Sequence, residues 1–297
     1  MNDLGRLRVL RELSHRGSLA KVAEALSYSP STISQQLTQL EREVGVSLLE
    51  PDGRGVRLTP QAQVLVGHVE RILQVIDEAQ ADVAASLTTL SGTVRIAAFQ
   101  SAMAAYVPAL VETLAHTHPG LRVEASQLEP EVAIPRLRAR ELDLVLTERY
   151  PGDATPWADD LAAAPLADDP LWLVVPSGHR VGRRGLAAMA GAQWVLEPTG
   201  TTARQWAESV CRGAGFVPDV RFEATDLRLH LDLVRTGRCV ALLPGLALVG
   251  APEGGWRKAA LPGSPQRTIE SVVRRGSADH PAIAAVRAAL GGAQASS

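Results

Sequence analysis

A run of short hydrogen-bonding side chains after residue 28 is the part of this sequence best suited to recognition chemistry. Ser29-Pro30 has the form of a helix start, with a capping hydroxyl before a proline at the first helical position. The polar residues that follow are Ser31, Thr32, Ser34, Gln35 and Thr38. Glutamine can pair bidentately with adenine, hydroxyls bind bases or phosphates, and free N–H groups at a helix start favour phosphate. The pattern predicts contacts to double-stranded DNA.

Helical periodicity supplies the elements that would position this run. Ile33, Leu37, Leu40 and Val44 are spaced as the buried stripe of a helix over 30–44. A shorter helix over 19–26 and a first helix over 4–16 precede it, and the tight turn gives helix-turn-helix proportions. Such proportions also occur in proteins that bind no DNA, so a solvated polar face is the alternative interpretation.

A hairpin and a long helix are expected next. Residues 46–50 and 56–58 are predicted to form two strands around a glycine-rich turn, in which Arg54 would reach the DNA backbone. From Thr59-Pro60, a heptad seam predicts a helix that pairs with a second copy of the chain. The seam consists of Ala62, Leu65, Val69, Ile72, Ile76, Ala79 and Val83. Packing against its own domain is the alternative.

Composition bounds these hypotheses. The 297 residues are 46% hydrophobic and 21% charged, which fits a globular chain of two or three domains. The net charge is −2, and residues 1–58 hold eight basic and seven acidic residues, so pattern rather than charge supports DNA binding. The sequence has no apolar run long enough to span a bilayer and no N-terminal signal pattern, so no membrane partner and a cytoplasmic location are expected.

From residue 93 the pattern alternates between strands and helices, which predicts βαβ units. Two sets are expected, joined by crossings near 162–165 and 265–267, with a small-molecule cleft between two lobes. The expected strands cover 93–99, 121–126, 143–147, 171–175, 193–196, 220–224, 239–243 and 268–274. The expected helices cover 102–116, 131–140, 201–213, 226–236 and 281–290.

Enzymatic chemistry finds little support. The sequence lacks a Gly-x-Ser-x-Gly elbow, a Walker loop and a His-Glu-x-x-His motif, and His116 and His118 would face different sides of a helix. We expect no catalytic residues, no cofactor and no metal. Cys211 and Cys239 predict no disulfide framework, although a redox pair is an alternative. An enzyme or a transport solute-binding protein are the rival classes, which ligand turnover or export would reveal.

The N-terminal motifs resemble those of the LysR-type transcriptional regulators. The resemblance covers essentially the whole chain and is carried by the segments 17–26, 29–37, 40–41, 45–49 and 53–59, in family order and spacing. It implies winged-helix dimers or tetramers joined by a long linker helix, with a two-lobed C-terminal domain similar to periplasmic binding proteins. Three positions depart from the family pattern: Leu49 replaces a usual phenylalanine, Pro51 a basic residue, and Gln35 a common arginine.

The resemblance also implies an effector cleft lined by loops at strand ends. Its residues in this sequence are Gln100, Ser101, Ala102, Glu129, Thr147, Glu148, Thr199, Gly200, Thr201, Thr202, Thr225, Leu243 and Pro244. Ser101 and Thr201–Thr202 lie near expected helix starts, where hydroxyl and N–H groups suit a carboxylate or other anion. Plain helix capping is the alternative for each of them.

Together these patterns predict an α+β multidomain fold. We expect a winged helix-turn-helix domain at 1–58, a linker and dimerisation helix at 59–90, and a two-lobed α/β effector domain at 91–297. The first lobe would cover about 91–163 and 268–297, and the second about 164–267. The expected function is that of a sequence-specific DNA-binding transcription regulator whose activity is modulated by a small-molecule effector between the lobes.

Overall fold

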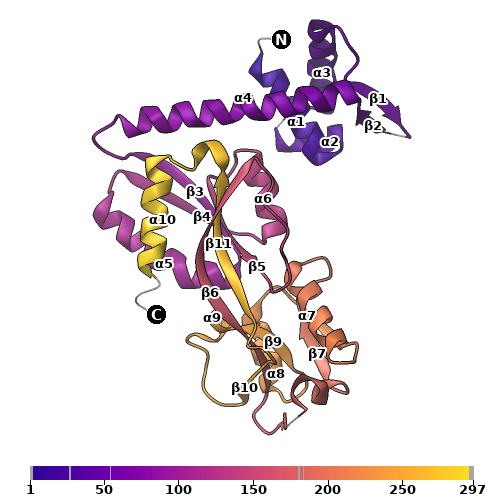
Figure 1. Cartoon of the computed structure of the whole chain (residues 1–297), viewed down its shortest axis with the longest axis vertical. Helices are drawn as coiled ribbons and strands as arrows, with labels where there is room; N and C mark the ends of the chain where they lie inside the picture. Colours follow the sequence, from indigo (N-terminus) through magenta and orange to yellow (C-terminus); the bar gives the residue numbers. More distant parts are fainter. Residues whose placement is uncertain (1–2, 27, 54, 180, 183, 294–297) are drawn as a thin grey trace. The chain divides into compact units, whose positions relative to one another are not determined.

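The computed structural model describes residues 3–26, 28–53, 55–179, 181–182 and 184–293 (Figure 1). The chain divides into two compact units. The first comprises Met1–Ser86 and Arg275–His280, and the second comprises Leu87–Arg274 and Pro281–Ser297.

Three helices form the centre of the first unit: α1 (Leu4–Arg16), α2 (Leu19–Ala25) and α3 (Pro30–Val44). Their ends follow the local signals in the sequence. Ser18 and Ser29 accept hydrogen bonds from N–H groups in the first turns of α2 and α3. Gly17 and Gly45 end α1 and α3 in the left-handed conformation, with φ of 71° and 79°. Their inner faces bury one apolar core.

The hairpin consists of β1 (Leu49–Asp52) and β2 (Gly55–Leu58), which pair antiparallel with Leu49 opposite Leu58. The expected first strand at 46–50 therefore begins three residues late. The reason is a tertiary contact: Glu41 Oε1 accepts hydrogen bonds from the Leu48 and Leu49 N–H groups, and this holds the preceding segment as a loop. Arg54 lies outside the described residues.

The long helix α4 (Pro60–Ala85) uses two adjacent faces. Ala62, Val69 and Leu73 are buried in the core of the first unit, with Ile76 partly buried beside them. The other face is apolar but exposed, with Val64, Ile72, Val75, Ala79 and Val83 in helical spacing. The predicted seam therefore divides between an internal face and an exposed face.

The second unit begins with the first lobe, a sheet in the order β6-β11-β5-β3-β4. Strands β3 (Gly92–Ala98), β4 (Leu121–Gln127) and β5 (Leu144–Arg149) run parallel, whereas β11 (Gln266–Arg274) is antiparallel to β5 and to β6 (Leu161–Pro176). Helices α5 (Gln100–Thr117) and α10 (Pro281–Ala293) pack on each other, and α6 (Pro130–Arg138) contacts β3, β5 and β11.

Strand β6 joins the first lobe to the second. It pairs with β11 from Leu161 to Pro170, and from Leu171 onward with β9 (Ala241–Pro244) and β10 (Trp256–Ala260). The lobes therefore meet near Pro170, later along the chain than the crossing expected at 162–165. The remaining elements of the second lobe are η1 (Gly185–Met189), β7 (Gln193–Leu196), α7 (Thr202–Gly213), β8 (Asp219–Glu223), α8 (Leu227–Arg235) and α9 (Gly245–Leu248).

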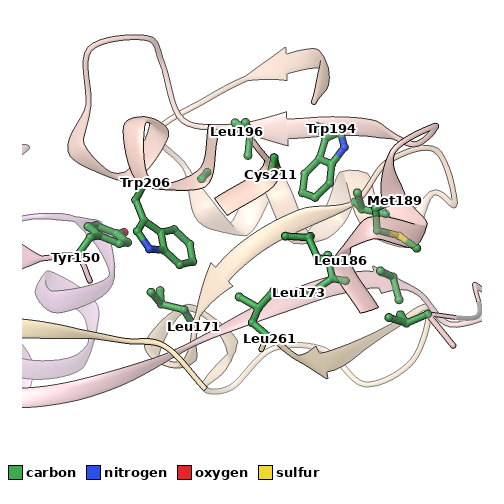
Figure 2. Packing of buried hydrophobic residues seen from close by; sticks show 14 residues of the cluster. Tyr150, Leu171, Leu173, Leu186, Met189, Trp194, Leu196, Trp206, Cys211 and Leu261 are labelled. Atoms are coloured by element: carbon green, nitrogen blue, oxygen red, sulfur yellow. The ribbon is translucent and has the colours of Figure 1, made fainter. Parts of the chain in front are cut away.

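Large side chains fill the core of the second lobe on one side of its sheet (Figure 2). Trp194 is fully buried there among Met189, Cys211 and neighbouring leucines. Nearby, the Tyr150 and Trp206 rings lie 5.3 Å apart between centroids. The opposite side is covered by α8, with Leu231 and Val234 completely buried.

One glycine in the first lobe marks a close backbone approach. A Cβ atom at Gly120 would lie 2.6 Å from the Leu90 carbonyl oxygen. Because that neighbour is backbone, we expect Gly120→Ala to lower the free energy of unfolding by about 1–3 kcal/mol. Urea titration would measure this, with Gly178→Ala as the control, since no atom lies within 4 Å of its added Cβ. Equal loss in both variants would contradict the steric explanation.

Candidate DNA interface and effector site

The α3 helix presents the polar face that the sequence predicts. Ile33, Leu37 and Leu40 are completely buried on one side. The exposed residues on the other side are Ser29, Pro30, Ser31, Ser34, Gln35 and Thr38, while Thr32 is partly buried. The Ser29 hydroxyl caps the helix and contacts the hydroxyls of Ser31 and Thr32 at 2.7 and 2.8 Å. Ser34 and Gln35 therefore lie on the exposed side of a helix whose other side is buried.

Ion pairs occupy several basic side chains of the first unit. Arg6, Arg11 and Arg16 contact carboxylates of the same unit, and Arg57 contacts Glu50. Lys21 on α2 and Arg42 on α3 are basic and exposed, and they lie close in sequence to the residues of the polar face. The predicted set of DNA-contacting residues does not include these two, although exposed Lys and Arg side chains commonly contact phosphates.

In the second unit, the centre of the candidate effector site is Arg267 on β11. Its side chain is 1% exposed and donates two hydrogen bonds to Asp169 Oδ2, at 2.9 and 2.7 Å. It also donates to Glu148 and, at 2.7 Å, to Ser101 Oγ. Burial alone would lower the pKa of Arg267, but the adjacent Glu148 carboxylate raises it, so the guanidinium stays charged.

Two further contacts join the lobes at helix starts. Gln100 donates to Asp226 Oδ1 at 2.6 Å and accepts from the Leu227 N–H at 2.7 Å. Glu131 accepts from the N–H and hydroxyl of Thr202, at 3.1 and 3.2 Å. The α7 and α8 N-termini, which could attract an anion, are thus occupied by residues of the protein.

The other predicted cleft residues fall into three groups. Ala102, Thr147, Leu243 and Pro244 are buried, and Pro244 lines a cavity of the second lobe. Thr201 caps α7 by accepting from the Arg204 N–H. The exposed ones are Thr199, Gly200 and Thr225. The predicted set therefore gathers around strand ends and helix starts, but few of its polar atoms are unoccupied.

Uncompensated carboxyl groups distinguish this site. Burial raises the pKa of Glu129 to about 7, and repulsion by Glu148 and Glu131 adds to the effect. Burial likewise raises the pKa of Glu197 to about 9, with Glu148 and Glu129 as repelling neighbours. Arg267 is the cation that opposes both shifts, and it already lies against Asp169 and Glu148.

The cavity itself lies in the second lobe. It is small, with space of about 20 Å³, which is room for little more than one water molecule. Its walls include Tyr150, Glu197, Trp206 and His230. Sequence reasoning missed these residues and also Arg267, Asp169 and Asp226. Asp226 carries the local signal of a helix N-cap, because its side chain accepts from the Arg228 and Leu229 N–H groups. Arg267 and Asp169 carry no local signal, because they are brought together from 98 residues apart.

The cysteines do not form a redox pair in this structure. Both are free and buried, and they belong to different hydrophobic clusters. Burial raises the pKa of Cys211 to about 12 and that of Cys239 to about 11, so neither is a reactive thiolate near neutral pH. Among the described residues, no cluster suited to a metal ion occurs, and no helix has the length and apolarity to cross a bilayer.

A winged helix-turn-helix joined by a long helix to a two-lobed α/β unit defines a class of ligand-responsive DNA-binding proteins. Residues 4–63 match the family described as bacterial regulatory helix-turn-helix protein, lysR family, and residues 87–295 match the LysR substrate binding domain. The chain belongs to the LysR family. It is therefore a DNA-binding transcription regulator with an effector-binding domain, and not an enzyme.

Curated relatives agree with this membership, and a solved structure agrees with the fold. The chain is 29% identical over 245 residues to the transcriptional dual regulator GltC of Bacillus subtilis, covering 82% of this chain and 80% of GltC. It is 27% identical over 284 residues to the DNA-binding transcriptional dual regulator OxyR of Escherichia coli, covering 93% and 90%. A full-length OxyR structure from Pseudomonas aeruginosa has a TM-score of 0.66 at 20% identity, covering 98% and 95%.

Proposed function

We propose that this regulator reads DNA with the exposed face of α3 and responds to a ligand bound between the lobes of its second unit. The observation that supports this most directly is the division of α3 into a fully buried apolar side and an exposed polar side. Ser34 and Gln35 contact base edges, and Ser29, Pro30, Ser31, Thr32 and Thr38 contact bases or the backbone around them. Arg54 would extend the contact through the wing.

The proposed domains follow the predicted boundaries, with DNA binding at 1–58, the linker at 59–90 and effector binding at 91–297. The effector site includes the predicted residues at the ends of β3, β4, β5, β7 and β9. Because Gln100 and Glu131 connect the lobes, a ligand that competes for either of their contacts changes how the lobes close. A transcription regulator of this type works where the DNA is, so we place it in the cytoplasm.

We also propose that the exposed apolar face of α4 forms a homodimer interface, with tetramers as a further assembly. Exposed apolar stripes of this length are unfavourable in water unless a partner covers them. Val75 lies in the middle of α4 and Val83 in its last turn. Their side chains are 61% and 65% exposed. Ile76 belongs to the internal core, so it is not a clean probe of the interface.

Ile72→Asp combined with Val75→Asp is therefore expected to convert the assembly to monomers of 31.5 kDa, measured by light scattering. Two carboxylates would be desolvated in the paired state but remain hydrated in the monomer. Val217→Asp, at a side chain that is 77% exposed in the second unit, is the matched control and should leave the mass unchanged. A double variant with the wild-type mass would contradict this interface.

A further inference from the structure

Helix α1 connects the helix proposed to read DNA with the long helix of the first unit. It packs on both α3 and α4, and the three helices share one apolar core. Apolar burial is non-directional, so the core alone does little to fix how α4 slides or turns against α1. The placement of α3 relative to α4 therefore depends on directional contacts between α1 and α4.

Charged side chains in the middle of both helices form such a contact. Arg11 is 4% exposed, and its Nε atom donates to Glu70 Oε1 of α4 at 2.7 Å. His15 Nε2, about one turn later on α1, lies 2.8 Å from the same oxygen. Glu12 is also buried and accepts from Arg11 and Arg16 of its own helix, at 3.0 and 2.8 Å. The Glu70 carboxylate is thus held from two positions of α1.

Glu70 stays ionised in this setting. Burial raises its pKa, but hydrogen bonds from His15 and Arg11 outweigh burial and lower the pKa below its usual value. Its neighbours Val69 and Leu73 on α4 are buried in the shared core. The ion pair therefore lies beside the apolar contact between the helices, and a charge-assisted hydrogen bond of this kind is short and directional.

A second contact holds the start of α4. The Thr59 hydroxyl accepts from the Ala62 N–H and donates to the Ser47 carbonyl oxygen at 2.9 Å. Glu70 follows Thr59 by 11 residues, which is about 16 Å along a helix. A helix held at two points so far apart has little freedom to swing about its start or to turn about its axis.

Stability alone does not account for charges at these positions. A buried ion pair is often no more stabilising than apolar side chains of similar size, because both ions lose their hydration. Leu10 and Leu13, on either side of Arg11 and Glu12 in the sequence, are apolar and buried in the core. What the ion pair adds is geometry, since its hydrogen bond tolerates little change in distance or angle.

We propose that Arg11 and Glu70 are positioning residues for DNA recognition, whose ion pair fixes α4 on α1 and thereby sets the half-site spacing that the regulator accepts. This rests on the proposed reading by α3 and on the proposed α4 dimer. In that dimer the α4 helices hold the protomers together, and each α3 is connected to its α4 through α1. Two α3 helices at a fixed separation fit half-sites about one DNA turn apart, and each added base pair rotates one half-site by about 34°.

The test uses DNA that the wild type itself selects from random-sequence duplexes. The selected site is then made with its own spacing, with one or two base pairs added, and as a single half-site. In gel-shift titrations, one added base pair is expected to weaken wild-type binding at least about tenfold, because the DNA must be twisted back. Arg11→Met combined with Glu70→Gln should reduce that loss to about threefold or less, since α4 is then less strictly preorganised on α1. Binding to the single half-site should stay within about twofold of the wild type, because the α3 face is unchanged.

The double substitution removes one charge of each sign, so the salt dependence should not change. Should it prevent folding, as judged by circular dichroism, Glu70→Ala removes the same acceptor at a side chain that is 25% exposed and leaves Arg11 paired with Glu12. It should relax the spacing in the same way. The matched control is Arg138→Met with Asp160→Asn, an ion pair of 2.7 Å in the second unit, which should keep the wild-type spacing preference.

Three results would overturn the inference. An unchanged spacing loss in both Glu70 variants would show that the apolar core alone places α4. Equal weakening on the single half-site would show that the charges support the fold of the DNA-binding unit and not its placement. A wild type that accepts every spacing would have no fixed separation to set.

Failure of the underlying proposals gives different results. A wild type that is monomeric by light scattering rejects the α4 dimer, and the inference falls with it. Selection of no DNA sequence rejects reading by α3 in the same way. A dimer that selects paired half-sites but keeps its spacing preference in both Glu70 variants rejects the positioning role alone.

Discussion

Replacing Arg267 by methionine is expected to lower the free energy of unfolding of the second unit by about 3–5 kcal/mol. The guanidinium is 1% exposed and is held by Asp169, Glu148 and Ser101, and it lies 4.9 Å from the centre of the Phe99 ring. Methionine fills part of the volume but leaves two buried carboxyl groups without a cation. They must then take up protons or remain charged in an apolar setting, and both cost stability.

Tryptophan fluorescence during urea unfolding measures the free energy of unfolding of the second unit. All five tryptophans lie between residues 157 and 256, so the signal reports on the second unit alone. Arg221→Met removes the exposed ion pair with Asp219 and should cost less than about 1 kcal/mol. Adding Glu148→Gln and Asp169→Asn to Arg267→Met should recover stability. Wild-type stability of the single variant would show that Arg267 does not compensate these carboxyl groups.

The first unit was largely predictable because its signals are local. Ser29-Pro30 and Gly45 fix the ends of α3, and the apolar spacing between them fixes its buried side. The first strand of the hairpin was predicted to begin three residues early, since Glu41 accepts hydrogen bonds from the Leu48 and Leu49 N–H groups from a separate helix. No turn or strand propensity encodes such a contact.

Some strands of the second unit form because they pair with segments that are distant in the sequence. Residues 161–170 have the alanine, aspartate and proline content of a loop, yet they are strand because β11 pairs with them from about 100 residues away. Strand β10 was missed for a similar reason, since its pairing with β6 rather than its own composition makes it a strand. The crossing between the lobes consequently falls near Pro170, later along the chain than expected.

The candidate effector site was predicted as a set of positions but not as a set of charges. Gln100, Ser101, Glu148 and Thr202 do lie at strand ends and helix starts. Their partners are more distant in sequence, as with Gln100 and Asp226 or Ser101 and Arg267. Hydroxyls that suggested an anion site are already bonded to protein groups. The chemistry of the site thus depends on long-range pairs, which a single sequence does not reveal.

The second large effect is expected in DNA binding, where Ser34→Ala combined with Gln35→Ala should weaken selective binding about 30-fold or more. Each side chain that reads a base edge contributes about 1–3 kcal/mol of discrimination, and the two are adjacent on the exposed face of α3. The measurement is a gel-shift titration on the DNA beside the protein's own gene, at two salt concentrations. Folding should be unaffected, because neither side chain belongs to the core.

The matched control exchanges a serine and a glutamine that are also exposed but lie in the second lobe. Ser177→Ala with Gln193→Ala should bind DNA as the wild type does. A control of mechanism is Arg42→Ala, which should weaken all DNA sequences alike and reduce the salt dependence by about one counterion. The neutral Ser34 and Gln35 should change selectivity and leave the salt dependence as it was. If the Ser34, Gln35 variant keeps its selectivity, base reading belongs to another part of the first unit, and the wing becomes the element to test.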